Sequence, residues 1–325
     1  MPVKLHQLIG LVFICVVLLC LISACEPQTR DVPTQPSGMA PFPLEMTDQS
    51  GKLVRIESEP VKIISLAPSN TEIVYALGLQ DKLVGVTKFC NYPEAAQQKP
   101  EIGGFSDVDI EKVVAIDPDL VLASNIHRDG ITPELERLGI AVLTIAPKTI
   151  ADVLLSIDLV GIATGHRNVA ASVTTEMNNR IKAITSKTAN LSDSQRVKVL
   201  YILWHDPLMT VSSVTHIHEI ITKSGGINIA ADLGGDYPTI SLEAVLIADP
   251  QVIIAGSGHG SGQDVPFQFV LTEPRLAEVE ARLQNQIYEV DADLTSRTGP
   301  RIVQGLEKLA SFIHPELFED SINGN

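Results

Sequence analysis

The sequence predicts an α/β protein built from two similar lobes with mainly parallel sheets, bridged by a long helix and leaving a ligand cleft between the lobes. Three observations support this fold class. Short β-branched runs alternate with helical segments along the chain, a pattern typical of parallel sheets. One helix and strand segment occurs twice. A helical stretch with a single apolar stripe separates the two sets of strands.

Length and composition limit the possible classes of protein. The chain has 325 residues, of which 45% are hydrophobic and 19% charged. This content is sufficient for more than one packed core and excludes general disorder. The 24 Lys and Arg against 39 Asp and Glu give a formal net charge of −15. A nucleic-acid partner is therefore not expected, because phosphate neutralisation needs clustered basic residues.

The first elements in chain order are a signal and a tether. Residues 1–24 fit a lipoprotein signal peptide, because Lys4 precedes about 15 apolar residues, fewer than the roughly 20 of a membrane-spanning helix. Ile22-Ser23-Ala24-Cys25 resembles the lipobox of bacterial lipoproteins, so Cys25 is the expected lipidation site. An uncleaved signal anchor is the alternative. Residues 25–50 are rich in proline and predict a flexible tether.

Cysteine usage agrees with an extracytoplasmic protein that is lipid-anchored to the cell membrane, on its periplasmic side or outer surface. Cys15 and Cys20 leave with the signal, and Cys25 is modified. Only Cys90 then stays in the folded part, so no disulfide is expected.

Two lobes and a bridge account for the rest of the chain. The N-terminal α/β lobe is predicted over residues 51–149 and the C-terminal α/β lobe over 191–325, where Pro300 opens the last helix. The predicted strands are Lys62–Leu66, Leu83–Val86, Leu120–Ala123 and Val142–Ile145 in the first lobe, and 197–202, 252–255 and 286–290 in the second.

The bridge is predicted over residues 150–190. Apolar side chains recur there at helical spacing, which indicates a long helix with one apolar face; they are Val169, Val173, Met177, Ile181 and Ile184. Gly161 and Gly165 are expected to divide the stretch into a shorter and a longer helix.

The two lobes contain a repeat. The segment from Ile110 to Ala123 aligns without a gap on the segment from Leu242 to Ala255. In both copies a short helix ends at Asp-Pro, because proline lacks an amide donor and restricts the residue before it, and a buried strand follows. The repeat predicts pseudo-two-fold lobes, with the cleft between them as the ligand site.

Glu111 and Glu243 occupy matching positions in the repeat, each at the start of its helix. One interpretation is that the helix dipole favours a carboxylate there. The other is that the two acids, one per lobe, dock onto matching arginines of a two-fold symmetric partner. The residues alone leave both interpretations open.

Four aromatic residues are candidates for gripping a flat ligand. Phe105 and Tyr237 lie on glycine-rich loops, each six residues before one of the paired glutamates. Trp204 and Phe89 follow predicted strands, at the strand exits where α/β proteins bind ligands. Rings that face each other across a cleft stack on a planar group. Simple packing is the alternative for each ring.

Polar candidates are fewer. Asp293 and Arg297 follow the last predicted strand, and they either bond polar substituents of a ligand or form an internal ion pair. His216 and His218 point to different faces of a helix and are poor co-ligands.

Neither a metal site nor catalysis is predicted. The loop histidines have no metal-ligand spacing; they are His127, His205 and His259. A metal-binding receptor is therefore a minor alternative. The sequence has no phosphate-binding glycine loop, nucleophile elbow or His-Glu-x-x-His helix. We therefore expect no enzyme and no cofactor.

Several segments together resemble one known family. They are Lys62-Ile63-Ile64-Ser65-Leu66-Ala67-Pro68-Ser69-Asn70-Thr71-Glu72, Val84-Gly85-Val86 with Asn91-Tyr92-Pro93, and Ile110-Glu111 with Asp117-Pro118-Asp119-Leu120-Val121. From about Lys62 to Leu309 the chain resembles the cobalamin and ferric-siderophore binding proteins of ABC importers, a family of periplasmic binding proteins. Within that family it is most similar to the members that bind cobalamin.

The resemblance implies a monomeric receptor that captures a corrinoid as cargo, with cobalamin first, and delivers it to an ABC permease dimer. A ferric siderophore or haem is the alternative ligand. The ligand-binding residues that it implies are Phe89, Phe105, Trp204, Tyr237, Asp293 and Arg297. It also implies that Glu111 and Glu243 dock on permease arginines.

One position departs from the family pattern. Where the cobalamin binders have a tryptophan, this chain has Ser124, followed by Asn125, Ile126 and His127. A loop histidine, His127 or His205, is a candidate contact for the cobalt face of a corrinoid. Glu72, by contrast, is predicted to be structural, because Ser69-Asn70-Thr71-Glu72 matches a capping box.

Overall fold

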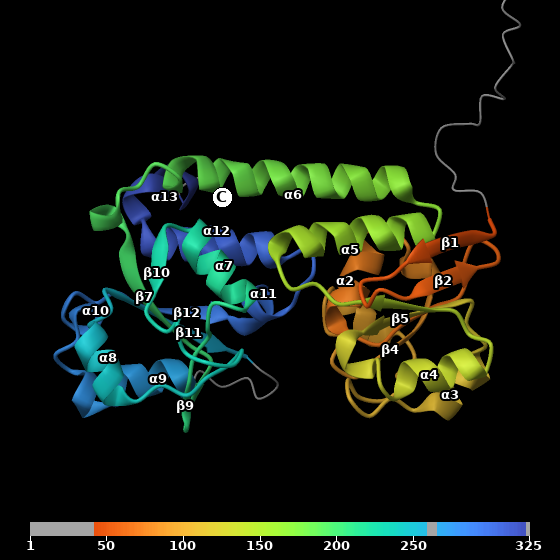
Figure 1. The fold of residues 1–325 in the computed structure, drawn as a ribbon, viewed down its shortest axis with the longest axis horizontal. Helices are drawn as coiled ribbons and strands as arrows, with labels where there is room; N and C mark the ends of the chain where they lie inside the picture. Colours follow the sequence, from red (N-terminus) through yellow and green to blue (C-terminus); the bar gives the residue numbers. More distant parts are fainter. Residues whose placement is uncertain (1–41, 259–264, 323–325) are drawn as a thin grey trace, which may run out of the picture. The chain divides into compact units, whose positions relative to one another are not determined.

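The computed structural model describes residues 42–258 and 265–322, with side chains to residue 318 (Figure 1). These residues belong to one compact unit, Gly38–Asn325. The predicted signal peptide, Cys25, most of the tether and His259 lie outside the described residues. Among the described residues, no helix combines the length and apolar character needed to cross a bilayer.

The N-terminal lobe is a parallel four-stranded sheet in the order β4-β3-β5-β6, with helices packed on it. The strands are nearly continuous apolar runs because both faces of the sheet are covered. Its elements are β3 (Ile63–Ser65), α2 (Pro68–Ala76), η1 (Gln80–Lys82), β4 (Leu83–Val86), η2 (Glu94–Gln98), α3 (Ile110–Ile116), β5 (Leu120–Ser124), η3 (Asn125–His127), α4 (Ile131–Arg137) and β6 (Val142–Ile145).

A short antiparallel hairpin precedes this sheet, formed by β1 (Leu44–Thr47) and β2 (Leu53–Ile56). Asp48 fixes it to the lobe, because one carboxylate oxygen accepts hydrogen bonds from the turn amides of Ser50 and Lys52 and the other accepts from Thr144 N in β6. The tether predicted over residues 25–50 is therefore too long at its C-terminal end.

The C-terminal lobe has a second parallel four-stranded sheet, in the order β10-β7-β11-β12. A two-residue hairpin pair, β8 and β9, projects from it. The elements are η4 (Asp193–Gln195), β7 (Val197–Ile202), β8 (Trp204–His205), β9 (Leu208–Met209), α7 (His216–Lys223), β10 (Gly226–Asn228), α8 (Leu242–Ala248), β11 (Val252–Ser257), α9 (Val265–Thr272), η5 (Pro274–Leu276), α10 (Glu280–Leu283), β12 (Ile287–Asp291), α11 (Ala292–Ser296), α12 (Ile302–Ile313) and α13 (Pro315–Ile322). Pro300 therefore does not open the last helix: α12 begins two residues later, and α13 follows it.

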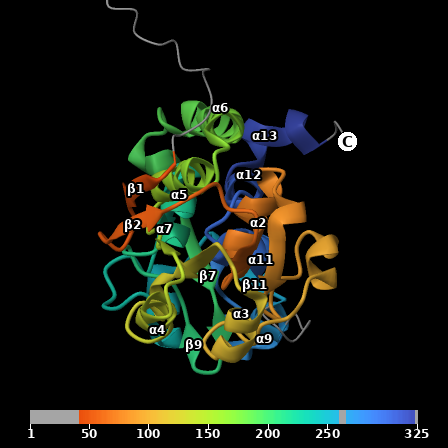
Figure 2. The same ribbon diagram turned by 90° about the vertical axis from the view of Figure 1, so that its right-hand side faces the viewer.

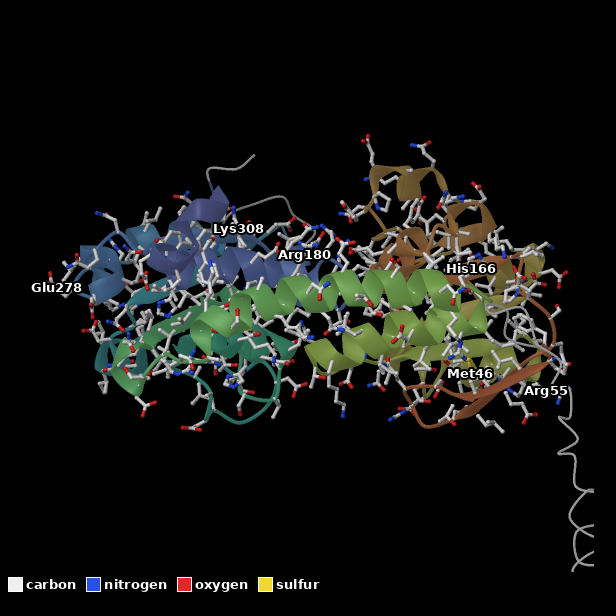
Figure 3. The ribbon with its side chains drawn as sticks, turned by 90° about the horizontal axis from the view of Figure 1, so that it is seen from above. Met46, Arg55, His166, Arg180, Glu278 and Lys308 are labelled. Atoms are coloured by element: carbon white, nitrogen blue, oxygen red, sulfur yellow. The ribbon has the colours of Figure 1, made fainter. Side chains whose placement is uncertain are left out.

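Two helices, α5 (Ile150–Ala163) and α6 (Arg167–Thr188), form the predicted bridge. They pack against each other, and α6 also packs against α7 and α12 of the C-terminal lobe (Figures 1 and 3). Gly165 adopts φ +76 between them, a left-handed conformation that suits glycine. Gly161, in contrast, lies inside α5, where a Cβ atom would approach the Ala170 Cβ to 2.4 Å. It permits close helix packing instead of ending a helix.

The repeat is confirmed in three dimensions. Asp109 caps α3 by accepting from Lys112 N, and Ser241 caps α8 by accepting from Ala244 N. Each helix ends at an aspartate in the left-handed conformation, Asp117 at φ 53 and Asp249 at φ 45, followed by proline and a buried strand. Both helices lie on the side of the molecule opposite α5 and α6 (Figure 1). The view turned by 90° places α3 on that same side (Figure 2).

Candidate functional site

A cavity of about 1050 Å³ lies between the two lobes. Its wall is formed by residues at the carboxyl ends of the strands or within three residues after them. The N-terminal lobe supplies Ala67 after β3, Phe89 after β4, Ser124 at the end of β5 and Pro147 after β6. The C-terminal lobe supplies Gly258 after β11 and Asp293 after β12. The carboxyl ends of parallel strands are the usual ligand edge of α/β sheets. The parallel topology of both lobes therefore produces one shared site.

Six of the predicted site residues line this cavity. Phe89, Phe105 and Ser124 come from the N-terminal lobe, and Tyr237, Asp293 and Arg297 from the C-terminal lobe. Tyr237 is 45% exposed and comes two residues after Gly235, which adopts φ +83. Partial burial, followed by the nearby charge of Asp236, raises the pKa of Tyr237, so the phenol is neutral and able to donate a hydrogen bond. The cavity thus has rings and polar groups from both lobes in its lining.

His127 is not a cavity residue, which corrects its predicted contact with cobalt. It is 1% exposed, with Nδ1 accepting a hydrogen bond from Ser124 N at 2.9 Å. Its Nε2–H donates to the Phe105 carbonyl at 2.6 Å, and the two rings meet edge to face with centroids 5.5 Å apart. Burial lowers the pKa of His127, which keeps the imidazole neutral. Because both ring nitrogens are engaged, His127 supports Phe105 and has no free atom for a metal.

Trp204 and His205 are not among the residues that line this cavity, and their predicted contacts with the ligand stay predictions. They form strand β8, whose hairpin with β9 sets their direction. The indole Nε1–H of Trp204 donates to the Asp206 carbonyl at 2.9 Å. The His205 ring packs between Trp204 and Phe269, with centroid distances of 4.9 and 6.0 Å. A two-residue hairpin is too short to be recognised in the sequence, so the hairpin itself was not predicted.

Asp293 and Arg297 form the internal ion pair that the sequence left open, at 2.8 Å. Arg297 also donates to Asn91 Oδ1 at 2.7 Å, across the gap to the other lobe, and lies 3.4 Å from the carboxylate of Glu72. Glu72 itself forms a two-bond pair with Arg301, with contacts of 3.0 and 2.7 Å.

The predicted capping box at Ser69 is therefore wrong. The cap of α2 is Ala67, and no side chain bonds to the first-turn amides. Ser69 lies inside the helix, and Glu72 points toward the C-terminal lobe. No local sequence signal gives this contact, because its partners are more than 200 residues away in the chain.

Glu111 and Glu243 are exposed on the outer helices α3 and α8. Among the described residues, neither carboxylate has an ion-pair partner within 4.0 Å. Glu243 has Arg275 nearby: the hydrogen bond that Arg275 donates to Glu273 is the main cause of the raised pKa of Arg275, and the charge of Glu243 adds to it.

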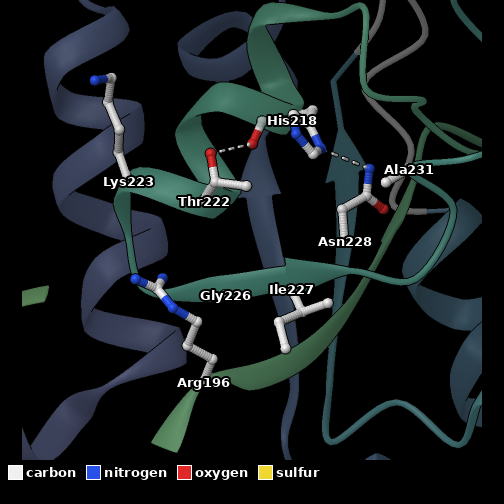
Figure 4. A pocket seen from close by; sticks show the side chains of 8 residues that line it. All are labelled: Arg196, His218, Thr222, Lys223, Gly226, Ile227, Asn228 and Ala231. Atoms are coloured by element: carbon white, nitrogen blue, oxygen red, sulfur yellow. Dashed lines mark hydrogen bonds between the residues drawn. The ribbon is translucent and has the colours of Figure 1, made fainter. Parts of the chain in front are cut away.

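A second cavity, of about 470 Å³, opens at the edge strand β10 (Figure 4). His218 and Asn228 approach each other there at 3.3 Å, and Arg196 and Ile227 complete one side. None of the predicted ligand residues lines it. His216, two residues from His218, is buried instead and donates from Nε2 to the Thr295 carbonyl at 2.8 Å, so the two histidines do face apart. Within the described ranges, no cluster of three or more His, Cys, Asp or Glu could hold a metal ion.

Comparison with known proteins gives consistent relationships. Residues 63–294 match the family model described as periplasmic binding protein. An ABC transporter substrate-binding lipoprotein of Bacillus subtilis is 34% identical over 284 residues, covering 86% of this chain and 88% of the relative. A cobalamin-binding protein of Halobacterium salinarum is 31% identical over 278 residues, covering 84% of this chain and 74% of the relative.

A solved structure shows the same relationship in three dimensions. The periplasmic vitamin B12 binding protein of Vibrio cholerae superposes with a TM-score of 0.66 at 28% identity. The superposition covers 79% of this chain and 98% of that structure.

Proposed function

The chain belongs to the periplasmic binding protein family, and on this premise we propose that it is an extracytoplasmic receptor that captures a corrinoid and delivers it to an ABC import permease. Cobalamin is the proposed ligand. The observation that carries the proposal is the cavity between the lobes, which is lined by Phe89 and Phe105 of one lobe and by Tyr237 and the Asp293–Arg297 pair of the other. The similarity to cobalamin and vitamin B12 binding proteins supports it.

The chemistry of the cavity fits a corrinoid. A corrin ring is a broad, nearly flat macrocycle whose edge carries neutral amide groups. Aromatic faces supply contact area to the ring, and a paired acid and arginine offer both an acceptor and donors to the amides. A volume of about 1050 Å³ lies at the upper end of usual ligand cavities, as a ligand of this size requires.

A ferric siderophore or haem is the alternative ligand. Such an iron complex would be favoured by free basic groups or by tyrosines near the iron. Arg301 is bound to Glu72 and Arg275 to Glu273, but Arg297, Lys88 and Tyr237 all line the cavity, with Lys88 Nζ 5.2 Å from the centroid of the Phe89 ring. The similarity to cobalamin and vitamin B12 binding proteins is what favours a corrinoid.

The paired glutamates are proposed as the permease contacts. Glu111 on α3 and Glu243 on α8 are exposed, one per lobe, and these two helices lie on the same side of the molecule (Figure 1). Three residues after each glutamate, α3 exposes Val114 and α8 exposes Leu246, both 41% exposed. Matching acids beside matching apolar side chains are suited to a two-fold symmetric protein partner.

Family members are periplasmic solute-binding proteins, which agrees with an extracytoplasmic location and with a role in binding. We propose that Cys25 carries the lipid anchor, that the chain acts as a monomer, and that it needs no cofactor. The substrate-binding lipoprotein of Bacillus subtilis supports the anchor by similarity.

Titration calorimetry of the mature chain with cobalamin, a ferric hydroxamate and haem tests the proposal. Cobalamin is expected to give the strongest saturable heat at one site per chain. Stronger binding of the hydroxamate or of haem would replace the proposed ligand with an iron complex. No saturable heat with any of the three would remove the assignment to this class of ligands.

A further inference from the structure

Glu72 is a buried carboxylate that the capping interpretation does not explain. Its side chain is 2% exposed, on helix α2 of the N-terminal lobe. Two arginines of the C-terminal lobe reach it: Arg301 through Nε and Nη2, at 3.0 and 2.7 Å, and Arg297 through Nη1, at 3.4 Å. A buried carboxylate is stable only with such partners, because burying an unpaired charge is costly. Glu72 therefore joins the two lobes.

Arg297 is the member of this cluster that also faces the ligand cavity. Its remaining donors contact Asp293 of its own lobe at 2.8 Å, Asn91 Oδ1 at 2.7 Å and the Phe89 carbonyl at 3.4 Å. The last two groups belong to the loop that carries the Phe89 ring. The Arg297 guanidinium thus binds Asp293 in the cavity lining and the loop of the Phe89 ring at the same time.

The charges around Arg297 make Glu72 the decisive partner. Asn91 and the Phe89 carbonyl are neutral, so Glu72 is the anion that holds Arg297 toward the N-terminal lobe, and Asp293 is the anion on its own side. Arg301, the other partner of Glu72, has its guanidinium carbon 3.9 Å from the centroid of the Tyr92 ring. Without the Glu72 charge, two neighbouring arginines would repel each other and Arg297 would lose its ionic contact with α2.

We propose that Glu72 is a positioning residue for ligand binding: it holds Arg297 at the cavity edge and, through Arg297, fixes the loop of Phe89. The proposal rests on the proposed function in one respect, that Arg297 contacts the corrinoid. The role of Glu72 does not depend on the repeat or on Glu111 and Glu243.

The experiment is a double-mutant cycle on the full chain, with cobalamin as the probe. Glu72→Gln is expected to weaken cobalamin binding about tenfold, within the range of coupling between neighbouring side chains. In the Arg297→Ala background the same substitution is expected to add no further loss, because the residue through which it acts is gone. In Glu72→Gln alone, Arg301 keeps a charge without its Glu72 partner, which could disturb folding. The double variant Glu72→Gln/Arg301→Gln removes that charge as well and is expected to show the same weakening of cobalamin binding.

A matched control separates positioning from general stability. Glu307 on α12 forms a similar two-bond pair with Arg180 of α6, at 2.8 and 2.7 Å, away from the cavity lining. Glu307→Gln is expected to leave the cobalamin affinity unchanged. An affinity loss as large as that of Glu72→Gln would contradict the proposal, as would an equal loss from Glu72→Gln in the Arg297→Ala background.

Amide hydrogen exchange without ligand decides the positioning claim independently. In Glu72→Gln, exchange at residues 87–91 is expected to become faster while the strands β3 and β5 keep their protection. Unchanged exchange in that loop, or a uniform increase over the whole lobe, would overturn the proposal. A wild-type chain that binds no cobalamin would refute the proposed function, and the exchange result would still decide the role of Glu72.

Discussion

The two lobes have matching outer surfaces but differ at the cavity. On the outside, α3 and α8 are each capped by a side-chain oxygen at the same position, and each ends at an aspartate in the left-handed conformation. Exposed and buried residues alternate in the same way along both helices. At the cavity, Phe105 is held by the buried His127 and the Phe89 loop by Arg297. Tyr237 also lies on a glycine-containing loop, which is held by Ser212, whose N and Oγ donate to the Asp236 and Gly235 carbonyls. Trp204 lies on a two-residue hairpin outside the cavity lining. The two lobes therefore match on the exterior and differ in the side chains that hold their cavity rings.

On the proposed function, the two surfaces have separate tasks. An exterior that docks on a two-fold symmetric partner would have to stay symmetric, whereas a cavity for an asymmetric ligand would not. In both lobes, hydrogen bonds hold the loop of a cavity ring before binding. The four predictions below test this division, from the largest expected effect to the smallest.

The largest effect is expected on the symmetric exterior. Replacing both Glu111 and Glu243 by Ala should abolish corrinoid uptake that depends on this receptor while leaving cobalamin affinity unchanged, because both carboxylates are remote from the cavity. Residual docking should weaken as ionic strength rises. Loss of cobalamin binding in the double variant would show that the two acids are misassigned.

At the cavity, one ring from each lobe should contribute to binding. Phe105→Ala and Tyr237→Ala are each expected to weaken cobalamin binding by about 1 to 3 kcal/mol, the scale measured for aromatic stacking on nucleic-acid bases. Hydrogen bonds hold both loops before binding, so little conformational entropy is lost when the ligand binds. Calorimetric titration measures both variants. An unchanged affinity in either variant would remove that ring from the proposed site.

His127 tests the support of Phe105. His127→Ala leaves the Phe105 carbonyl and Ser124 N without partners and is expected to lower the free energy of unfolding by about 1 to 3 kcal/mol. Because burial lowers the pKa of His127 in the folded chain, the stability that the neutral form provides is present above the unfolded value of 6.5 and is lost as pH falls through the folded value.

The buried His216 of the C-terminal lobe has a lowered pKa for the same reason, so wild-type stability should fall on acidification through both groups. His127→Gln should reduce this pH dependence without removing it. Denaturant unfolding between neutral and acidic pH measures the change. An identical pH profile in wild type and His127→Gln would show that the imidazole of His127 does not titrate on unfolding.

The smallest effect is expected at Trp204. Because this ring lies outside the cavity lining, Trp204→Ala should change the cobalamin affinity less than Tyr237→Ala does. A loss equal to that of Tyr237→Ala, seen by titration, would mean that the β8–β9 hairpin closes over the bound ligand.

Most of the fold could be predicted from the sequence because its signals are local. The strands Leu83–Val86, Val142–Ile145 and Val197–Ile202 coincide with β4, β6 and β7, since an apolar β-branched run between turns determines a buried strand. The three-residue strand β10 was missed, because Gly226-Ile227-Asn228 becomes a strand only by pairing with β7. The β1–β2 hairpin was missed for a similar reason, since Asp48 joins it to β6 across almost 100 residues.

The cavity lining was predictable where a position after a strand determines it. Ser124 ends β5, Asp293 lies in the first turn of α11, and the other lining residues that were predicted lie on loops; these are Phe89, Phe105, Tyr237 and Arg297. The sequence failed where a side chain's direction depends on distant partners. His127 turns inward to a carbonyl in another loop, and Glu72 meets two arginines of the opposite lobe.

A crystal structure of the mature chain with cobalamin tests the central claim most directly. We expect the corrin ring between the lobes, with Phe105 and Tyr237 against opposite faces or edges and Arg297 bonded to an amide of its rim. A corrinoid bound at the β10 cavity beside Arg196, or at the interlobe cavity with neither ring in contact, would contradict the account.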